Sequence, residues 1–414
     1  MSKETNGNQA NLNIGLIGHV DHGKSTLVEA LSGVFPDTHS EEIKKGISIR
    51  LGYAGCEFRK CPDCPEPEAY TTQKKCPNCG TESVLLRRVS FVDAPGHEVF
   101  MATMLSGASL LDGAILVIAA NEPCPMPQTR EHLAAMKIVG MEHLIVAQNK
   151  IELVSDEKAI QNFHDIKNFI QEEMSNEVPI IPISAAHKTN VDLLIQTVEK
   201  YIPTPNLDSK KPGRLLVARS FDINRPGSTP KNWKGGVVGG SITHGTFKVG
   251  DEVEIRPGIR KGNKWEPITT EIISMKTDFG HLEEAKPGGL IGIGTLLDPA
   301  LSKGDRLVGN LVGSPEDLPP VYTTIIAEIE LLSRVVGSKE EKKIDKIETG
   351  EMLLIVIGTA RTLGVVQGEK KGKNRYQIDL RIPICAELGT RMAISRQISN
   401  RYRLIGWAVL RDGS

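Results

Sequence analysis

The feature that most constrains this chain is a glycine-containing stretch near its N-terminus, Gly18-His19-Val20-Asp21-His22-Gly23-Lys24-Ser25. It fits the pattern G-x-x-x-x-G-K-[ST], and it lies where the apolar run Leu12–Val20 gives way to a predicted helix over Lys24–Leu31. In that setting, backbone N–H groups and the helix N-terminus bind phosphate, Lys24 reaches the outer phosphates, and Ser25 offers a hydroxyl to Mg²⁺. The sequence therefore predicts a phosphate-binding loop.

The loop and the first helical turn supply the candidate ligands for a nucleotide and its metal. Asp21 and Ser25 are also predicted to coordinate Mg²⁺. The candidates for the nucleotide are Gly18, Val20, Asp21, His22, Gly23, Lys24, Ser25 and Thr26.

A second motif, Asp93-Ala94-Pro95-Gly96-His97, follows the predicted strand Val89–Val92. At the carboxyl end of that strand, Asp93 is placed to hold Mg²⁺ through a bound water. Gly96 is placed to offer its N–H to the γ-phosphate, and His97 to orient the attacking water. An aspartate that caps a Pro-Gly turn is the alternative interpretation, but together with the phosphate-binding loop the motif favours a nucleotide site.

Apolar runs alternate with helical segments as far as residue 205, which predicts a mostly parallel sheet covered on both faces. Two prolines near residue 205 indicate a linker, and beyond it short apolar runs between Gly and Pro turns predict β-barrels. A second break comes at Ser314–Pro320. The predicted fold is an α/β P-loop domain followed by two all-β barrels, with a flexible N-terminus at 1–10, a nucleotide domain at 11–205, and barrels at 206–320 and 321–414.

Composition argues against a membrane protein and divides the chain into two oppositely charged halves. No apolar stretch approaches the roughly 18 residues of a membrane span, and no export signal is visible, so we expect a cytoplasmic protein with no membrane partner.

Residues 1–205 carry 18 Lys+Arg and 26 Asp+Glu, and residues 206–414 carry 32 and 25, which gives net charges of −8 and +7. The basic half fits a polyanionic partner, although ordinary variation between domains would look the same.

Two further motifs end predicted strands, Asn149-Lys150-Ile151-Glu152 and Ser184-Ala185-Ala186. Together they resemble the guanine-reading N-K-x-D and S-A-x motifs of GTPases, in which a carboxylate accepts both N–H donors of the guanine edge. Adenine lacks that donor pair, so the resemblance favours GTP and GDP over ATP. Here the carboxylate is Glu152, one methylene longer than the usual aspartate.

Four of the seven cysteines form two C-x₂-C pairs, Cys61 with Cys64 and Cys76 with Cys79, separated by 11 residues. Each pair can wrap a turn around one metal, and four thiolates give the closed tetrahedral shell of structural Zn²⁺. Disulfides are a poorer alternative in a cytosolic chain. The sequence predicts a zinc insert over residues 56–80, with Cys56 as a weaker competing ligand.

The motifs V-D-H-G-K-S, D-A-P-G-H and N-K-I-E, followed by two barrels, resemble the translational GTPases of the elongation-factor-Tu type. Residues 46–49, G-I-S-I, are similar to the first switch of that family, with Ser48 in place of its Mg²⁺-ligating threonine. Residues 236–251 resemble the signature of the family's second domain. The resemblance implies a GTPase whose nucleotide holds its switch segments through Ser48 and Gly96.

The cysteine insert narrows the resemblance, because elongation factor Tu has none. It is similar to the zinc knuckle of the gamma-subunit family of archaeal and eukaryotic translation initiation factor two. That resemblance implies a GTPase that carries initiator methionyl-tRNA to the small ribosomal subunit, with hydrolysis as the release switch. It also implies a heterotrimer with alpha and beta subunits and the cofactors GTP/GDP, Mg²⁺ and Zn²⁺.

Alternative functions stay open on the sequence alone. A selenocysteine-specific elongation factor normally carries a further C-terminal domain, and the GTPase subunit of ATP sulfurylase fits the zinc insert poorly. A non-catalytic zinc and nucleic-acid module is disfavoured by the complete set of nucleotide motifs. The five arginines between Arg391 and Arg411 form either a phosphate-contacting face or the polar side of a strand.

Overall fold

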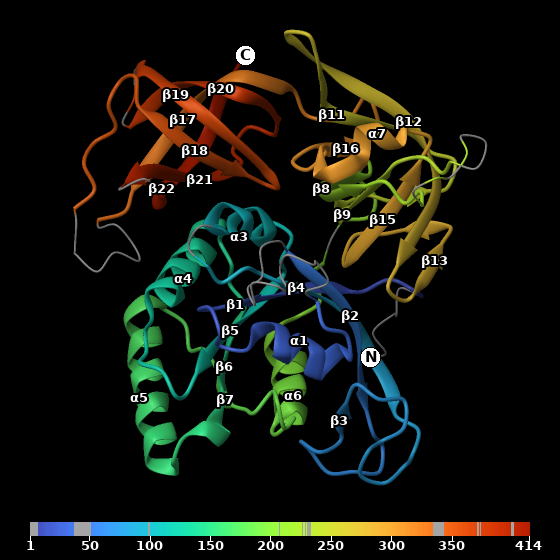
Figure 1. The fold of residues 1–414 in the computed structure, drawn as a ribbon, viewed down its shortest axis with the longest axis vertical. Coiled ribbons are helices and arrows are strands. Elements are labelled where there is room, and N and C mark those ends of the chain that lie inside the picture. The colour runs from blue at the N-terminus through green and yellow to red at the C-terminus, as the bar shows by residue number, and fades with distance from the viewer. Residues whose placement is uncertain are drawn as a thin grey trace. The chain divides into compact units, whose positions relative to one another are not determined.

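The computed structural model describes most of the chain, which forms two compact units (Figure 1). The described residues are 7–36, 51–97, 100–206, 208–225, 227, 229, 233–333, 343–370, 372, 374–398 and 401–414. Among them, the first unit contains Ala10–Met104 and Leu111–Pro205. The second contains residues 7–9, Leu105–Leu110 and Asn206–Ser414. The boundary after Pro205 falls within the predicted linker.

The first unit is built on a mostly parallel sheet, as the sequence predicts. Strand β1 lies between β4 and β5 and pairs with both in parallel, whereas β2 and β3 add antiparallel strands at one edge. Strand β2 was not predicted. The strands in spatial order are β3 (Tyr70–Thr71), β2 (Gly52–Lys60), β4 (Val84–Asp93), β1 (Leu12–Ile17), β5 (Gly113–Ala119), β6 (Leu144–Asn149) and β7 (Ile180–Pro182).

Helices cover both faces of this sheet. Alternate residues of β1, among them Leu12 and Ile14, form a buried core with Leu27 of α1 and Leu194 of α6. Helices α4 and α5 lie on the side of the sheet away from α1 and α6 (Figure 1). The helices of this unit are α1 (Lys24–Ser32), α4 (Pro127–Val139), α5 (Asp156–Glu173) and α6 (Val191–Tyr201), with a 3-10 turn at Ile151–Leu153. Helix α3 (Met101–Ala108) begins in this unit and continues into the segment Leu105–Leu110 of the second.

A buried arginine joins the sheet to the last helix of the first unit. Arg87 on β4 is 1% exposed and pairs with Glu199 on α6. Its guanidinium also donates to the carbonyl oxygens of Val198 at 3.0 Å and Ile202 at 2.8 Å. The Val198 carbonyl also accepts the N–H of Ile202, so the cation adds a second donor there and binds the carbonyl just past the last residue of α6.

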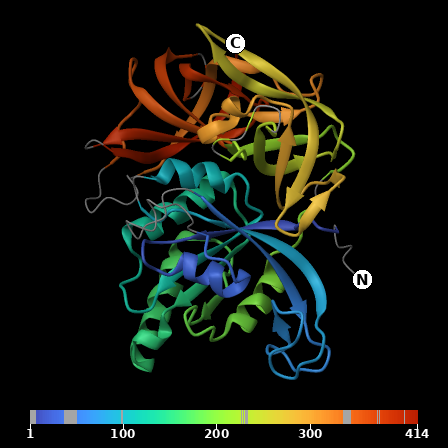
Figure 2. The ribbon, with the colours of Figure 1, turned by 45° about the vertical axis from the view of Figure 1, so that its right-hand side comes forward.

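The second unit contains two closed β-barrels, which confirms the predicted fold class (Figures 1 and 2). In the first, β11 pairs with β12 to close the ring. Its strands in spatial order are β11 (Glu252–Lys261), β16 (Leu311–Gly313), β8 (Arg214–Phe221), β9 (Val237–His244), β15 (Leu290–Thr295) and β12 (Lys264–Thr277). Beside it lie β10 (Phe247–Lys248), β13 (Gly280–Leu282), β14 (Glu284–Ala285), the short helix α7 (Pro299–Ser302) and a 3-10 turn at Lys303–Asp305.

The second barrel has a core of alternating side chains, such as Ile325, Ala327 and Ile329 on β17, that are fully or almost fully buried. Its strands in spatial order are β17 (Val321–Leu331), β20 (Arg375–Cys385), β19 (Ala360–Glu369), β18 (Met352–Ile357), β21 (Arg391–Ile398) and β22 (Arg401–Gly413).

Three of the five arginines near the C-terminus make contacts within this barrel. Arg396 pairs with Glu351, Arg411 donates to Glu328 at 3.0 Å, and the Arg391 guanidinium lies 4.9 Å from the centre of the Trp407 ring. These contacts favour the polar side of strands over a face that binds phosphates.

Residues 7–9, at the start of the described chain, are held within the second unit. Gln9 is 2% exposed, and its amide donates to the Gly288 carbonyl at 2.7 Å and accepts from the Lys286 N–H at 3.0 Å. Residues 1–6 of the predicted flexible N-terminus lie outside the described residues. No helix in the described part of the chain is long and apolar enough to cross a membrane.

Candidate functional site

The phosphate-binding loop connects β1 to α1 and has an unusual backbone. Gly18, Asp21 and Gly23 have φ values of 139°, 60° and 90°. A Cβ on Gly18 would lie 2.3 Å from the carbonyl oxygen of Val117 on β5, so this position requires glycine. The loop thus has the left-handed conformations that bring successive N–H groups to one side.

Lys24 and Gly96 meet at this loop. Lys24 is 6% exposed, and its Nζ donates to the carbonyl oxygens of Gly18 at 3.1 Å and His19 at 2.7 Å. A Cβ on Gly96 would lie 2.7 Å from Lys24 Nζ and 2.9 Å from the Val20 nitrogen. The two predicted phosphate motifs therefore lie against each other, with Gly96 next to the Lys24 ammonium and the loop backbone.

Ser25 and Asp93 form the part of the site that fits Mg²⁺. Asp93 is the last residue of β4 and is wholly buried, and its Oδ2 accepts a hydrogen bond from Ser25 Oγ at 2.5 Å. A hydroxyl and a carboxylate are the hard oxygen donors that Mg²⁺ prefers. Asp21 is exposed, and its predicted role as a ligand stays a prediction. Ser48 lies outside the described residues.

Asn149 connects the phosphate-binding loop to the predicted base site. Its Nδ2 donates to the His22 carbonyl at 2.9 Å, and its Oδ1 accepts from the Ala185 N–H at 2.9 Å. Asn149 is 2% exposed and ends β6, so one buried amide holds two loops that are far apart in the sequence. These contacts give Asn149 a positioning role beside its predicted place in the base motif.

The base-reading motifs form two short turns. Lys150 has a φ of 63° and precedes the 3-10 turn that presents the exposed carboxylate of Glu152. Ser184 and Thr189 exchange backbone hydrogen bonds of 3.2 and 3.0 Å, which close the turn that contains Ala185 and Ala186. An exposed carboxylate next to a closed turn is an arrangement that can accept N–H donors of a base.

His97 is half-buried after Gly96, and the centre of its ring lies 6.1 Å from that of Phe100. Residues 98 and 99 lie outside the described residues. The arrangement brings His97 next to the glycine that contacts the phosphate-binding loop, and its predicted catalytic role stays a prediction.

The four predicted zinc-binding cysteines come together in the insert that follows β2. Their sulfur atoms lie within 4.8 Å of one another, with Cys61–Cys79, Cys64–Cys79 and Cys64–Cys76 separations of 3.4, 3.5 and 3.7 Å. Disulfide sulfurs lie about 2.05 Å apart, whereas four sulfurs bound to one Zn²⁺ at about 2.3 Å lie about 3.8 Å apart. The cluster therefore fits a tetrahedral zinc site and not a pair of disulfides.

The ionisation of these thiols also fits a cation. Hydrogen bonds from Thr81 lower the pKa of the exposed Cys79 thiol to about 6, which favours its thiolate near neutral pH. The hydrogen bond with Cys79 raises the pKa of Cys64, because one negative sulfur disfavours another nearby. A dication at the centre would remove this conflict.

Cys56, the weaker candidate ligand, lies away from this cluster. It is 3% exposed on β2, and its thiol donates to the carbonyl oxygen of Leu31 at 3.0 Å. Burial raises the pKa of Cys56, so a neutral thiol is favoured. The alternative that Cys56 competes for zinc is therefore wrong.

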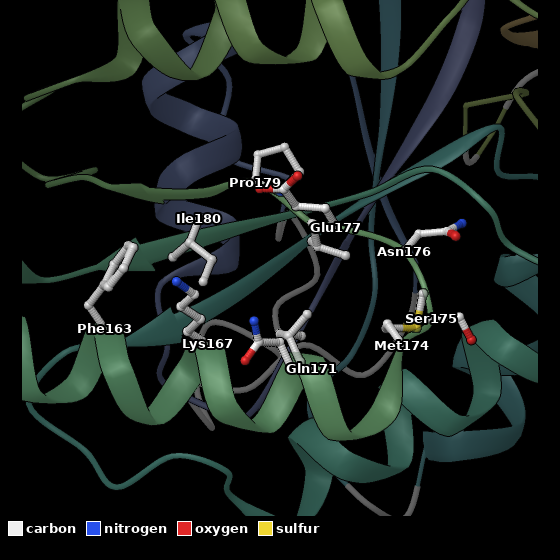
Figure 3. Close-up of a pocket in the computed structure, with 11 residues that line it drawn as sticks. Phe163, Lys167, Gln171, Met174, Ser175, Asn176, Glu177, Pro179 and Ile180 are labelled. Atoms are coloured by element: carbon white, nitrogen blue, oxygen red, sulfur yellow. The ribbon is translucent and has the colours of Figure 1, made fainter.

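A cavity of about 540 Å³ lies elsewhere in the first unit. Figure 3 shows it between α5, with Phe163 and Gln171, and the segment that leads into β7, with Pro179 and Ile180. None of the residues that line it belongs to the nucleotide motifs.

Two supports of the phosphate-binding loop were not predicted from the sequence. These are the carbonyl of Val117 on β5 and the imidazole of His132 on α4, which lies 2.9 Å from the Gly18 nitrogen. A single histidine in the amphipathic segment PQTREHLAAMKIV is the only signal in the sequence.

Comparison with known families and proteins agrees with this geometry. Residues 9–204 match the elongation factor Tu GTP binding domain, 235–308 match elongation factor Tu domain 2, and 323–410 match the C-terminal domain of initiation factor eIF2 gamma. The chain is 55% identical over 416 residues to translation initiation factor 2 subunit gamma of Pyrococcus abyssi, covering 100% of both chains. The subunit of Methanocaldococcus jannaschii is also 55% identical, over 99% of this chain and 100% of its own.

The chain belongs to the gamma-subunit family of translation initiation factor 2. As a member of this family, it is a translational GTPase and an initiation factor. Solved structures share its fold. A bacterial selenocysteine-specific elongation factor has a TM-score of 0.73 at 26% identity, over 96% of this chain and 58% of that one. Elongation factor SelB from Methanococcus maripaludis, in complex with a GTP analogue, has a TM-score of 0.72 at 20% identity, over 98% of this chain and 80% of its own.

Proposed function

We propose that this gamma-family chain, in its GTP form, carries initiator methionyl-tRNA to the small ribosomal subunit and releases it after GTP hydrolysis. The observation that carries the proposal is the 55% identity over the full length of chains named translation initiation factor 2 subunit gamma. The assembled nucleotide site supports it. The elongation-factor alternative has weaker support, because the likeness to such a factor is 26% and spans 58% of that chain.

Different residues of the site bind the phosphates, the guanine base and the Mg²⁺ of GTP. Loop N–H groups and Lys24 bind the phosphates, and Glu152 accepts the N–H donors of guanine. Ser25 and Asp93 would hold Mg²⁺, with Asp21 and Ser48 as the further candidates. When bound, Mg²⁺ neutralises charge on the outer phosphates.

His97 is proposed to orient the water that attacks the γ-phosphorus. The P–O bond to the β-phosphate then breaks, and GDP and inorganic phosphate are the products. Neither Gly18–Ser25 nor Asp93–His97 contains an arginine. The charge that develops in the transition state therefore needs a further cation from a partner, and hydrolysis by the free protein should be slow.

Charge supports an RNA partner for the second half of the chain. That half carries +7, whereas the first half carries −8. Phosphates of a tRNA would be attracted to the basic half. By family membership, we propose that the chain acts in the cytoplasm as the GTPase of a heterotrimer with alpha and beta subunits.

We also propose that Cys61, Cys64, Cys76 and Cys79 bind one structural Zn²⁺, which orders the insert after β2. The insert has its own anchor to the rest of the unit, because Glu66 accepts from Gln196 Nε2 on α6 at 2.6 Å. Main cores that do not include the cluster should fold without the metal.

The tRNA proposal predicts a nucleotide-dependent affinity. With alpha and beta subunits present at one fixed salt concentration, the GTP form should bind initiator methionyl-tRNA at least about tenfold more tightly than the GDP form, because the γ-phosphate holds the switch segments. Raising the salt should weaken the complex steeply through counterion effects. Equal affinity in GTP and GDP would refute the proposed switch.

Replacing His97 should separate hydrolysis from binding. His97→Ala should slow single-turnover GTP hydrolysis on ribosomal complexes by about a hundredfold, since the water loses its orienting group, and should leave GDP affinity nearly unchanged. His143→Ala, a change at another half-buried histidine of the first unit, is the matched control. An unchanged rate for His97→Ala would show that the role given to His97 is wrong.

The zinc proposal predicts about one zinc ion per chain in protein purified without added zinc, measured by metal analysis. Cys64→Ser should lower the content strongly, whereas Cys124→Ser, at a cysteine of similar exposure outside the cluster, should not. Chelation should loosen the insert and leave the rest of the unit folded. Protein without zinc whose four thiols all react freely would contradict the proposal.

A further inference from the structure

The start of the phosphate-binding loop is held from behind by a residue outside every nucleotide motif. The N–H of Gly18 donates to Nδ1 of His132 on α4, with a nitrogen–nitrogen distance of 2.9 Å. His132 is 1% exposed, so water cannot replace it as the acceptor. Gly18 is also confined by the carbonyl of Val117, which would lie 2.3 Å from a Cβ at this position.

The direction of this hydrogen bond determines the form of the imidazole. The backbone N–H can only donate, so Nδ1 must carry a lone pair and the ring proton must be on Nε2. Complete burial, together with the nearby cation of Lys24, lowers the pKa of His132 to about 3. The ring is therefore a neutral acceptor at physiological pH.

We propose that His132 is a positioning residue for nucleotide binding, which fixes the first peptide of the phosphate-binding loop to α4 through its δ-nitrogen. The inference rests on the proposed role of this loop in binding phosphate. His132 does not touch the nucleotide in this account. It keeps the backbone from Gly18 to Gly23 in its binding conformation before the nucleotide arrives.

Other parts of the loop are held by His22 and Asn149. The N–H of its first peptide, at Gly18, depends on His132. His22 is wholly buried, its Nδ1 donates to the Val117 carbonyl at 3.1 Å, and its own carbonyl accepts from Asn149. Without an acceptor on α4, the N–H of Gly18 would be buried and unpaired. The loop could relieve that cost only by leaving its binding conformation. The resulting loss of nucleotide affinity is roughly tenfold to hundredfold.

Two similar substitutions distinguish positioning from packing. Asparagine carries its amide oxygen on Cγ, as histidine carries Nδ1, so His132→Asn keeps an acceptor at that position. His132→Gln places its amide one bond further out, and His132→Leu has no acceptor. All three disturb packing, but only the last two remove the partner of Gly18.

The test measures two quantities for the full chain and for each variant. Titration with a fluorescent GDP analogue gives the GDP affinity, and unfolding in urea gives the free energy of unfolding. His132→Gln and His132→Leu should weaken GDP binding about tenfold or more, and His132→Asn should stay within about threefold of the parent chain. His164→Gln, at an exposed histidine on α5, is the control. Equal losses for Asn and Gln, or no loss for either, would overturn the inference.

Hydrogen exchange in the nucleotide-free protein gives a second readout. The peptide that contains Gly18 should exchange faster in His132→Gln than in His132→Asn, and equal rates would count against the inference. Should the Gln and Leu variants not fold, His132→Asn decides alone, because it should keep the parent affinity and a tenfold loss would overturn the inference.

Lys24→Ala distinguishes failure of the proposed phosphate site from failure of the role proposed for His132. If this change leaves GDP affinity unchanged, the loop is not the phosphate site and the proposed function fails with it. If Lys24→Ala weakens binding strongly and His132→Gln does not, only the role given to His132 fails.

Discussion

The phosphate-binding loop keeps backbone N–H groups in a shape that a free chain would rarely hold, because Gly18, Asp21 and Gly23 all have positive φ values. Neighbouring elements provide the constraint. The carbonyl of Val117 on β5 confines the start of the loop, and the amide of Asn149 on β6 holds its middle. These supports meet because a parallel sheet brings the carboxyl ends of its strands to one edge.

The sequence predicts the parts of this site that depend on short spacing. The strand, loop and helix between Leu12 and Ser32 have strong local signals, and so has Asp93 at the end of an apolar run. Strand β2 (Gly52–Lys60) was missed because its segment, GYAGCEFRK, has no apolar run and becomes a strand through pairing with β4. The contacts of Asn149 depend on how three distant loops meet, which no local pattern encodes.

The cysteine insert shows the same difference between what local spacing predicts and what tertiary contacts decide. Two C-x₂-C pairs predict a four-sulfur cluster, because each pair has the spacing that wraps one metal. Spacing alone could not predict whether Cys56 joins this cluster. Pairing of β2 with the sheet directs its thiol to the carbonyl of Leu31, away from the cluster. Local spacing therefore predicts which residues gather, and tertiary packing decides which are left out.

The central claim is that the phosphate-binding loop, Asp93 and the turns after Asn149 and Ser184 form one Mg²⁺-dependent guanine nucleotide site. A competition titration tests it most directly, with a fluorescent GDP analogue displaced by GDP or by ADP, in Mg²⁺ and in EDTA. The account predicts displacement by GDP at concentrations where ADP has no effect, and weaker binding in EDTA. Equal displacement by ADP and GDP would contradict it.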